Sequence, residues 1–361
     1  MSRVYLDYNA TAPLRPEARH AVIEALALDG NPSSVHAEGR AAREAVEQAR
    51  DRVAAACGAG LGWEVVFTSG GTEANVWTLT RWGQGRVLVS AVEHPSVLKA
   101  RPDAEAIPVD SQGVIDLDAL ERLLRDASDP VLVALMHANN ETGVIQPVAE
   151  AARIAHAHGA LLHCDAVQSF GKIAMNVEAL GADSYALSAH KLGGPSGVGA
   201  LVVREGLDLP PLLVGGGQER GKRAGTENLT GLAGFAAVAA LPSPSHLQTL
   251  RDHLEAEAKR LAPSVIIPGN MVSRLPNTSL LLLPGVTGRQ QVMALDLAGI
   301  AVSAGSACAS GKVAASHVLA AMGLDAPLAA CAVRVSLGWG STAADAERFL
   351  EAWGKLAHKA L

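Results

Sequence analysis

What this sequence lacks excludes several classes of protein. Charged residues make up only 18% of the chain, the net charge is -6, and no long run of lysine or arginine occurs, so nothing favours binding to nucleic acid. No apolar segment is long enough to cross a bilayer without a charge or a glycine, and the first residues lack the apolar core of a signal peptide. We therefore expect a cytoplasmic protein with neither a membrane nor a nucleic acid as its partner.

Cysteine is also scarce. The four cysteines are Cys57, Cys164, Cys308 and Cys331, and none stands in a C-x-x-C spacing, which supports neither a zinc site nor a disulfide framework. Cys57, Cys164 and Cys331 follow or interrupt apolar stretches and are expected in the core. Cys308 lies in a run of small residues, 303–311, that we expect to form an exposed, mobile loop. Its thiol is then either incidental or a nucleophile.

The chain does contain enough apolar residues, 49%, to bury a large core. Two helical stretches come first, at 15–28 and 37–57. From residue 63 onward, strand-like and helical stretches alternate, which is typical of a mostly parallel sheet covered by helices on both faces. The expected strands are 64–68, 86–91, 131–136, 160–164, 183–188 and 198–203, the last of them antiparallel. Mainly helical segments with short strands at 278–283 and 332–336 then predict a smaller α+β domain.

A lysine marks the end of one expected strand. Residues 183–188 form a buried strand that continues through His190 and Lys191 into a turn rich in glycine. Burial lowers the pKa of a lysine, and the neutral amine can then attack a carbonyl group. A surface lysine at a strand end explains this stretch alone equally well.

Glycines at 70 and 71, followed by Thr72, connect another strand to a helix. Such a junction presents backbone N–H groups to an anion, although an ordinary capped turn has the same sequence. His94 and Asn140 also follow expected strands, at the edge where α/β sheets bind ligands. A surface histidine and simple turn chemistry are the alternatives for these two residues.

Two charged residues stand in apolar strands, where an unpaired charge is costly. Asp165 requires a cation, and a protonated pyridine nitrogen is a natural candidate. Alternatively, His163 and Asp165 are two ligands of an iron site whose third ligand is His190 or His94. Arg334 suits either a substrate carboxylate or a structural salt bridge.

A series of motifs runs through nearly the whole chain. They are YLDYNATAP (5–13), NPSS (31–34), TSGGTE (68–73), EH (93–94), NNETG (139–143), HCDAVQS (163–169), SAHK (188–191), GGGQERGKRAGT (215–226), SAC (306–308) and RVSLG (334–338). In these motifs the sequence resembles the cysteine desulfurases of the NifS/IscS type, in the class V aminotransferase family of pyridoxal-phosphate enzymes. The resemblance implies fold type I, with a seven-stranded-type, mostly parallel α/β sheet. Residues 15–250 would form the large cofactor-binding domain, and 1–14 with 251–361 the small domain that carries the cysteine loop.

The resemblance also implies a role for each matching residue. Lys191 would form the Schiff base with pyridoxal 5'-phosphate, and His94 would stack on its ring and assist proton transfers. The other implied ligands are Asp165 for the ring nitrogen, Gln168 for the ring hydroxyl, and Gly71, Thr72, Ser188 and His190 for the phosphate. Asn140 would contact the cofactor and, with Arg334, bind the substrate carboxylate. Thr226 would reach the phosphate of a neighbouring subunit, which implies a homodimer.

The activity implied is conversion of L-cysteine to L-alanine. The sulfur would become a persulfide on Cys308 and pass to an iron–sulfur scaffold or another acceptor protein, for assembly of iron–sulfur clusters or other thio-cofactors. The alternatives are a class V aminotransferase, a selenocysteine lyase, and a non-catalytic sulfur carrier or assembly partner.

Overall fold

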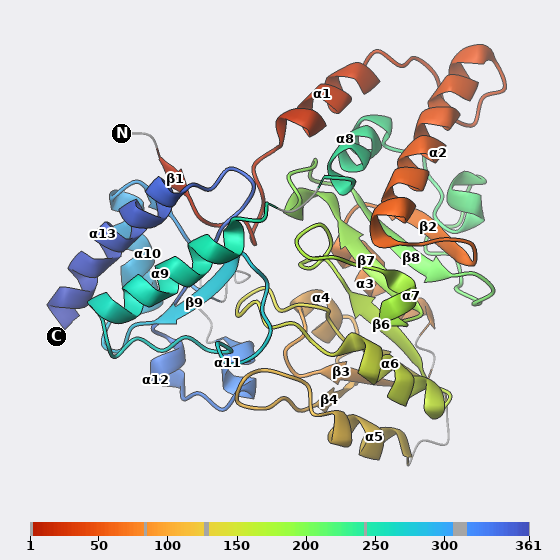
Figure 1. Ribbon diagram of the computed structural model, residues 1–361. Coiled ribbons are helices and arrows are strands. Elements are labelled where there is room, and N and C mark those ends of the chain that lie inside the picture. The colour runs from red at the N-terminus through yellow and green to blue at the C-terminus, as the bar shows by residue number, and fades with distance from the viewer. Residues whose placement is uncertain (1–2, 83–84, 126–129, 242–243, 306–315, 361) are drawn as a thin grey trace.

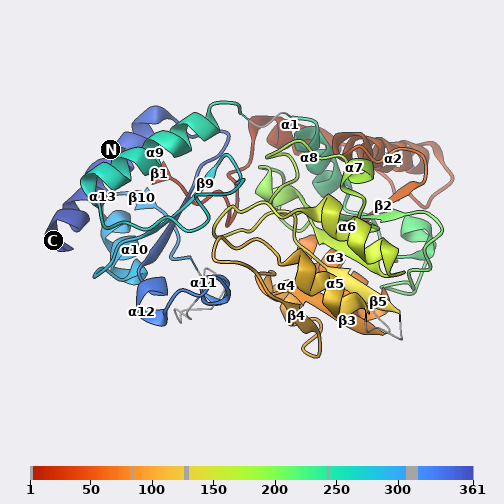
Figure 2. The same ribbon diagram turned by 60° about the horizontal axis from the view of Figure 1, so that its bottom comes forward.

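The computed structural model describes residues 3–82, 85–125, 130–241, 244–305 and 316–360. Figures 1 and 2 show two lobes, one built on a large sheet and one on smaller sheets covered by helices. The N-terminal strand lies in the smaller lobe, beside the C-terminal helix (Figure 1).

A seven-stranded sheet forms the centre of the larger lobe, in the order β2-β8-β7-β6-β5-β3-β4. Its strands are β2 (Trp63–Thr68), β3 (Arg86–Ser90), β4 (Glu105–Ile107), β5 (Val131–Ala134), β6 (Leu161–Asp165), β7 (Ser184–Ser188) and β8 (Gly199–Arg204). β8 is antiparallel to both its neighbours, and the other pairs are parallel. The predicted α/β fold is therefore confirmed, including the antiparallel strand. β4 was not predicted, because this edge strand is only three residues long and two of them are exposed.

Helices cover both faces of this sheet. They are α1 (Pro16–Ala25), α2 (Ala37–Cys57), α3 (Gly71–Trp77), α4 (Pro95–Leu98), α5 (Leu117–Arg125), α6 (Val148–Ala157), α7 (Val177–Leu180) and α8 (Leu229–Ala239). Alternate residues of a strand point to opposite faces, so Val65 packs in the core formed with α2, α5, α6 and α8, whereas Val66 packs against α3. Both layers enclose nearly continuous apolar strands, as is typical of a parallel sheet.

The smaller lobe joins the two ends of the chain. Its strands are β1 (Val4–Tyr5), β9 (Thr278–Leu282), β10 (Ile300–Ala301) and β11 (Ala332–Ser336); its helices are α9 (Leu247–Leu261), α10 (Gly288–Leu297), α11 (His317–Ala321), α12 (Ala326–Ala329) and α13 (Ala343–Ala360). β1 pairs with β10 and β9 with β11. Val4 and Leu6 pack in one core with Phe349 and Trp353. The predicted domain boundaries at residues 15 and 250 stay a prediction. No helix in the described ranges has the length and apolar composition needed to cross a membrane.

Candidate active site

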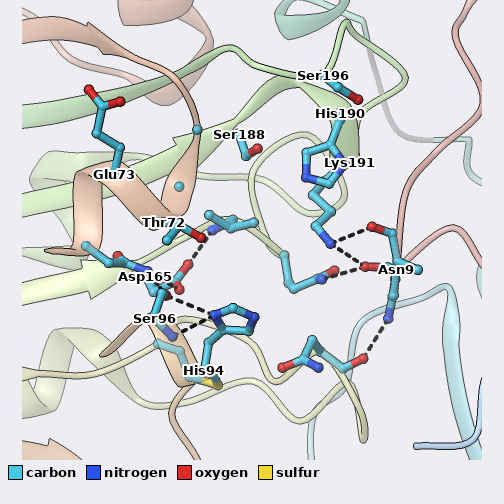
Figure 3. Close-up of a pocket in the computed structure, with 18 of the residues that line it drawn as sticks. Asn9, Thr72, Glu73, His94, Ser96, Asp165, Ser188, His190, Lys191 and Ser196 are labelled. Carbon is cyan, nitrogen blue, oxygen red and sulfur yellow. Dashed lines mark hydrogen bonds between the residues drawn. The ribbon is translucent and has the colours of Figure 1, made fainter. Parts of the chain in front are cut away.

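A pocket of about 450 Å³ lies at the carboxyl ends of the parallel strands, where sheets of this kind bind ligands. Figure 3 shows His94, Asp165 and Lys191 around one open space. Asn9 and Arg334 belong to segments of the smaller lobe, so both lobes contribute to the wall.

Most of the predicted site residues meet in this pocket. They are Gly71, Thr72, His94, Asn140, Asp165, Gln168, Ser188, His190, Lys191 and Arg334. Thr226 does not line it, and instead borders a separate cavity of about 80 Å³ with Ser69 and Gly197. Cys308 lies outside the described residues, so its exposure and its role stay predictions.

Lys191 follows β7 in the short 3-10 helix η2 (Ala189–Lys191). Its Nζ donates to the backbone carbonyls of Asn9 and Ala10, at 2.6 and 2.8 Å (Figure 3). The Nδ1 atom of the adjacent His190 lies 3.1 Å from the hydroxyl of Thr11. Burial, with further contributions from the charges of Lys191 and Lys172, lowers the pKa of His190 to about 4. His190 is therefore neutral near pH 7, and its ring carries a single N–H.

Asp165 ends β6 and is 7% exposed. Its Oδ2 accepts from Asn75 Nδ2 at 2.7 Å, and its Oδ1 accepts from the backbone N–H of Val167 at 3.0 Å. Within the described part of the chain, no lysine, arginine or histidine forms a salt bridge with this carboxylate. A buried carboxylate with only uncharged donors matches a positively charged nitrogen on a ligand.

His94 faces Asp165 across the same pocket. The backbone N–H of Ser96 donates to His94 Nδ1 at 3.1 Å, so in the neutral ring the proton resides on Nε2. Burial lowers the pKa of His94, and the opposing effect of Asp165 is smaller. We infer that the ring is neutral near pH 7 and presents a flat face and one N–H donor.

Sequence reasoning missed a supporting network behind these groups. Asn75 donates from Nδ2 to both Asp165 and the hydroxyl of Ser96, at 2.7 and 2.8 Å. Its Oδ1 lies 2.9 Å from Nε2 of the fully buried His163. The only signal in the sequence is that Asn75 occupies the apolar, buried side of α3, where a polar residue needs partners.

The same contacts argue against the iron site. Both ring nitrogens of His163 are engaged, Nδ1 with Ser184 Oγ at 2.7 Å and Nε2 with Asn75. The described ranges contain no cluster of three or more histidine, cysteine, aspartate or glutamate residues able to hold a metal ion. His163 instead orients Asn75, which in turn orients Asp165.

Arg334 forms a structural salt bridge, one of its two predicted roles, and the other, binding of a substrate carboxylate, stays a prediction. It is 1% exposed on β11, and its Nη2 donates to Asp7 Oδ1 at 2.8 Å while Nη1 donates to the carbonyl of Asn140 at 3.0 Å. The partner in this salt bridge, Asp7, was not predicted. The Nε atom has no hydrogen-bond partner in the described structure, which leaves a buried donor beside the pocket. Such an orphaned donor suits an anionic ligand group.

Gly71 is required where the pocket meets α3. A Cβ atom built at this position would lie 2.3 Å from Cγ2 of Val167, so a larger residue would require the Val167 side chain to move. The first N–H groups of a helix have no partner within the helix and can bind an anion. Ser188, which is buried, lines the same part of the wall.

The three described cysteines are buried, which confirms their expected place in the core. Burial raises the pKa of the Cys57 thiol to about 11 and raises that of Cys164 as well. None of the three lines the pocket. They are therefore poor candidates for a reactive thiolate.

Buried histidines predict that the protein loses stability in acid. Burial lowers the pKa of His137 to about 4 and that of His163 to about 3. Below about pH 6.5, the ordinary pKa of histidine, these side chains bind protons in the unfolded chain but not in the folded chain. The free energy of unfolding therefore decreases as the pH is lowered. We expect each residue to contribute about 2 kcal/mol of this loss between pH 7 and pH 5. Urea unfolding at the two pH values measures it.

Two variants separate the effect of histidine protonation from other causes of lower stability at acid pH. H137Q removes one titrating group, so its loss between pH 7 and pH 5 should be smaller than that of the wild type by about 2 kcal/mol. H158Q, at an exposed position, should retain the full loss. Equal losses in H137Q and the wild type would contradict the assignment.

Comparisons with known proteins agree with this geometry. The family model described as aminotransferase class-V matches residues 4–349. A cysteine desulfurase of Cereibacter sphaeroides is 42% identical and the match covers 97% of this chain and 95% of that protein. The cysteine desulfurase IscS of Dictyoglomus turgidum is 40% identical, with coverage of 99% and 95%. The crystal structure of a NifS-like protein from Rickettsia africae superimposes with a TM-score of 0.92 at 36% identity, over 99% of both chains. The chain therefore belongs to the aminotransferase class-V family, among the cysteine desulfurases of the NifS and IscS type.

Proposed function

We propose that this protein is a cysteine desulfurase that converts L-cysteine to L-alanine and retains the sulfur as a persulfide on Cys308. The names of its relatives support the reaction. The observation that carries the proposal is the buried Asp165, which has no cationic partner in the described structure and shares a pocket with Lys191.

The residues of the pocket fit pyridoxal phosphate. When bound, this group supplies an electron sink that stabilises negative charge at the substrate Cα. Lys191 would hold it covalently, Asp165 would bind the ring nitrogen and Gln168 the ring hydroxyl. The remaining proposed ligands are His94 stacked on the ring, Asn140 beside it, and Gly71, Thr72, Ser188 and His190 around the phosphate.

Each side chain then has a defined task. The Arg334 Nε and Asn140 bind the substrate carboxylate, and the Lys191 amine removes the proton from Cα. The Cys308 thiolate attacks the substrate sulfur, so that an S–S bond forms as the bond from Cβ to sulfur breaks. Cβ takes up a proton, for which the His94 Nε2–H is a suitable donor, and Lys191 returns a proton to Cα. The products, alanine and one protein persulfide, balance without an external oxidant.

A homodimer is part of the proposal. Thr226 follows a loop in which the carboxylate of Glu219 binds both Arg50 and the backbone N–H of Phe67, at 2.7 and 2.8 Å. This pairing holds Glu219 in a left-handed conformation with φ 47°. The loop is thus fixed against β2 in a single subunit, and Thr226 is held away from its own pocket.

Exposed apolar side chains on the same lobe also support the dimer. The exposed fractions are 59% for Ile23, 69% for Leu26, 84% for Val35 and 91% for Val214. Contact with a second subunit would remove this apolar surface from water. A sulfur-acceptor protein, such as an iron–sulfur scaffold, and a cytoplasmic location complete the proposal as predictions from the sequence.

Product analysis tests the function. The purified protein with pyridoxal phosphate, L-cysteine and a reducing agent should release alanine and sulfide in equal amounts. An aminotransferase would instead need a 2-oxo acid and would release no sulfide, whereas a selenocysteine lyase would turn over only the selenium substrate. A protein that forms no alanine from L-cysteine would overturn the proposal.

A further inference from the structure

Lys172 is a buried lysine to which the proposed reaction gives no task. It is 8% exposed, and its Nζ donates to Gln168 Oε1 at 2.5 Å and to Asn9 Oδ1 at 2.7 Å. No carboxylate in the described ranges forms a salt bridge with it. Burying an amine with only neutral partners costs free energy, so a core lysine of this kind requires an explanation.

Both acceptors belong to the candidate active site. The Gln168 Nε2 donates to the backbone carbonyl of Asn9 at 3.0 Å, and the Lys191 Nζ donates to the same carbonyl at 2.6 Å. The Asn9 side chain continues the network, because its Nδ2 donates to the carbonyl of Asn140 and to Thr278 Oγ1, at 3.2 and 2.9 Å. Asn9 thus connects the buried lysine, the reactive lysine and the smaller lobe.

The donor at Lys172 decides how the Gln168 amide is oriented. The Lys172 Nζ donates to Oε1 of Gln168, as it can whether or not it carries the extra proton, and this contact directs the NH₂ group away from the lysine. That NH₂ group then lies on the side of Asn9 and Lys191, in the pocket wall. The Asn9 carbonyl selects the same orientation, so Lys172 and Asn9 hold the amide from both of its ends.

The two lysines line the same small cavity. Lys172 and Lys191 both border a space of about 30 Å³ behind the main pocket. Burial lowers the pKa of Lys172, and the charges of Lys191 and Arg334 lower it further. The titratable groups that line the main pocket or this cavity are Tyr8, Arg15, Glu73, His94, Asp165, Lys172, His190, Lys191 and Arg334.

We propose that Lys172 is a positioning residue that fixes the amides of Gln168 and Asn9, and so sets the proton affinity of the linkage between Lys191 and pyridoxal phosphate. The proposal rests on the proposed cofactor. With its amide held by Lys172, Gln168 would offer its second N–H to the ring oxygen, and such a hydrogen bond would draw negative charge away from the linkage. Removing Lys172 weakens that bond and removes a nearby positive charge in the fraction of molecules in which it is protonated. Both changes favour the protonated linkage.

A pH titration of the visible absorption of bound pyridoxal phosphate tests the inference. In K172M the midpoint should rise by about one pH unit, a tenfold gain in proton affinity. K172Q retains an N–H donor without a charge and should give a smaller rise. K259M changes an exposed lysine and should titrate like the wild type. Methionine has the length of lysine and no charge to bury, so we expect K172M to fold; if it does not, K172Q supplies the comparison.

The outcomes separate the two proposals. A cofactor band in the wild type with the same midpoint in K172M and K172Q would overturn the role of Lys172, even if urea unfolding showed both variants to be less stable. A wild type that forms no visible band with pyridoxal phosphate would overturn the proposed function, and this inference with it.

Discussion

Replacing Lys191 by alanine should abolish both turnover of L-cysteine and covalent retention of pyridoxal phosphate. The amine at this position is the only lysine nitrogen in the described residues that lines the main pocket, where it lies against two backbone carbonyls. Its loss removes the covalent attachment and also the base that takes the Cα proton. We expect alanine formation to fall at least about 10³-fold, the range over which a positioned base contributes.

Borohydride reduction followed by peptide mass spectrometry measures the attachment directly. In the wild type the reduced cofactor should be found on the peptide that contains Lys191, and K191A should retain none. K99A, at an exposed lysine, is the matched control and should keep both the label and the activity. A cofactor attached to a different lysine in the wild type would contradict the assignment of the site.

Much of the fold could be predicted because local signals and tertiary packing agree. The helix expected at 37–57 coincides with α2, whose ends are set by a cap from His36 and by Gly58 in a left-handed conformation. The strand expected at 332–336 coincides with β11. The helix expected at 15–28 ends earlier, at Ala25, because the residues after it form a turn and are exposed.

The site could be predicted only where a residue carries its own signal. Lys191 and Asp165 stand out because a charge follows an apolar strand. Asn9, Asn75 and Lys172 could not be found this way, since their roles depend on partners far along the chain, such as the contact of Lys172 with Asn9 across 163 positions. Pairing between such distant residues follows from the packing of the two lobes and leaves no local pattern in the sequence.

Replacing Cys308 by alanine should stop the release of alanine from L-cysteine, because the substrate sulfur then has no acceptor. The other three of the four cysteines are buried, and none borders the pocket. Cys308 follows Gly305 by three positions in the sequence. A Cβ atom built on Gly305 would lie 3.3 Å from Glu141 Oε2, and the Ser316 hydroxyl donates to the same oxygen at 2.6 Å. Glu141 follows the pocket residue Asn140. Both described ends of the segment that contains Cys308 therefore lie beside the site.

The most direct test of the account compares alanine release from L-cysteine by the wild type, C308A and C331A in one assay with excess reducing agent. C331A, which changes a buried cysteine, is the matched control for the loss of a thiol. We expect alanine from the wild type and C331A, and at most a few per cent of that amount from C308A, which still binds pyridoxal phosphate. Equal alanine from C308A and the wild type would contradict the persulfide mechanism, and no alanine from any of the three would contradict the proposed function.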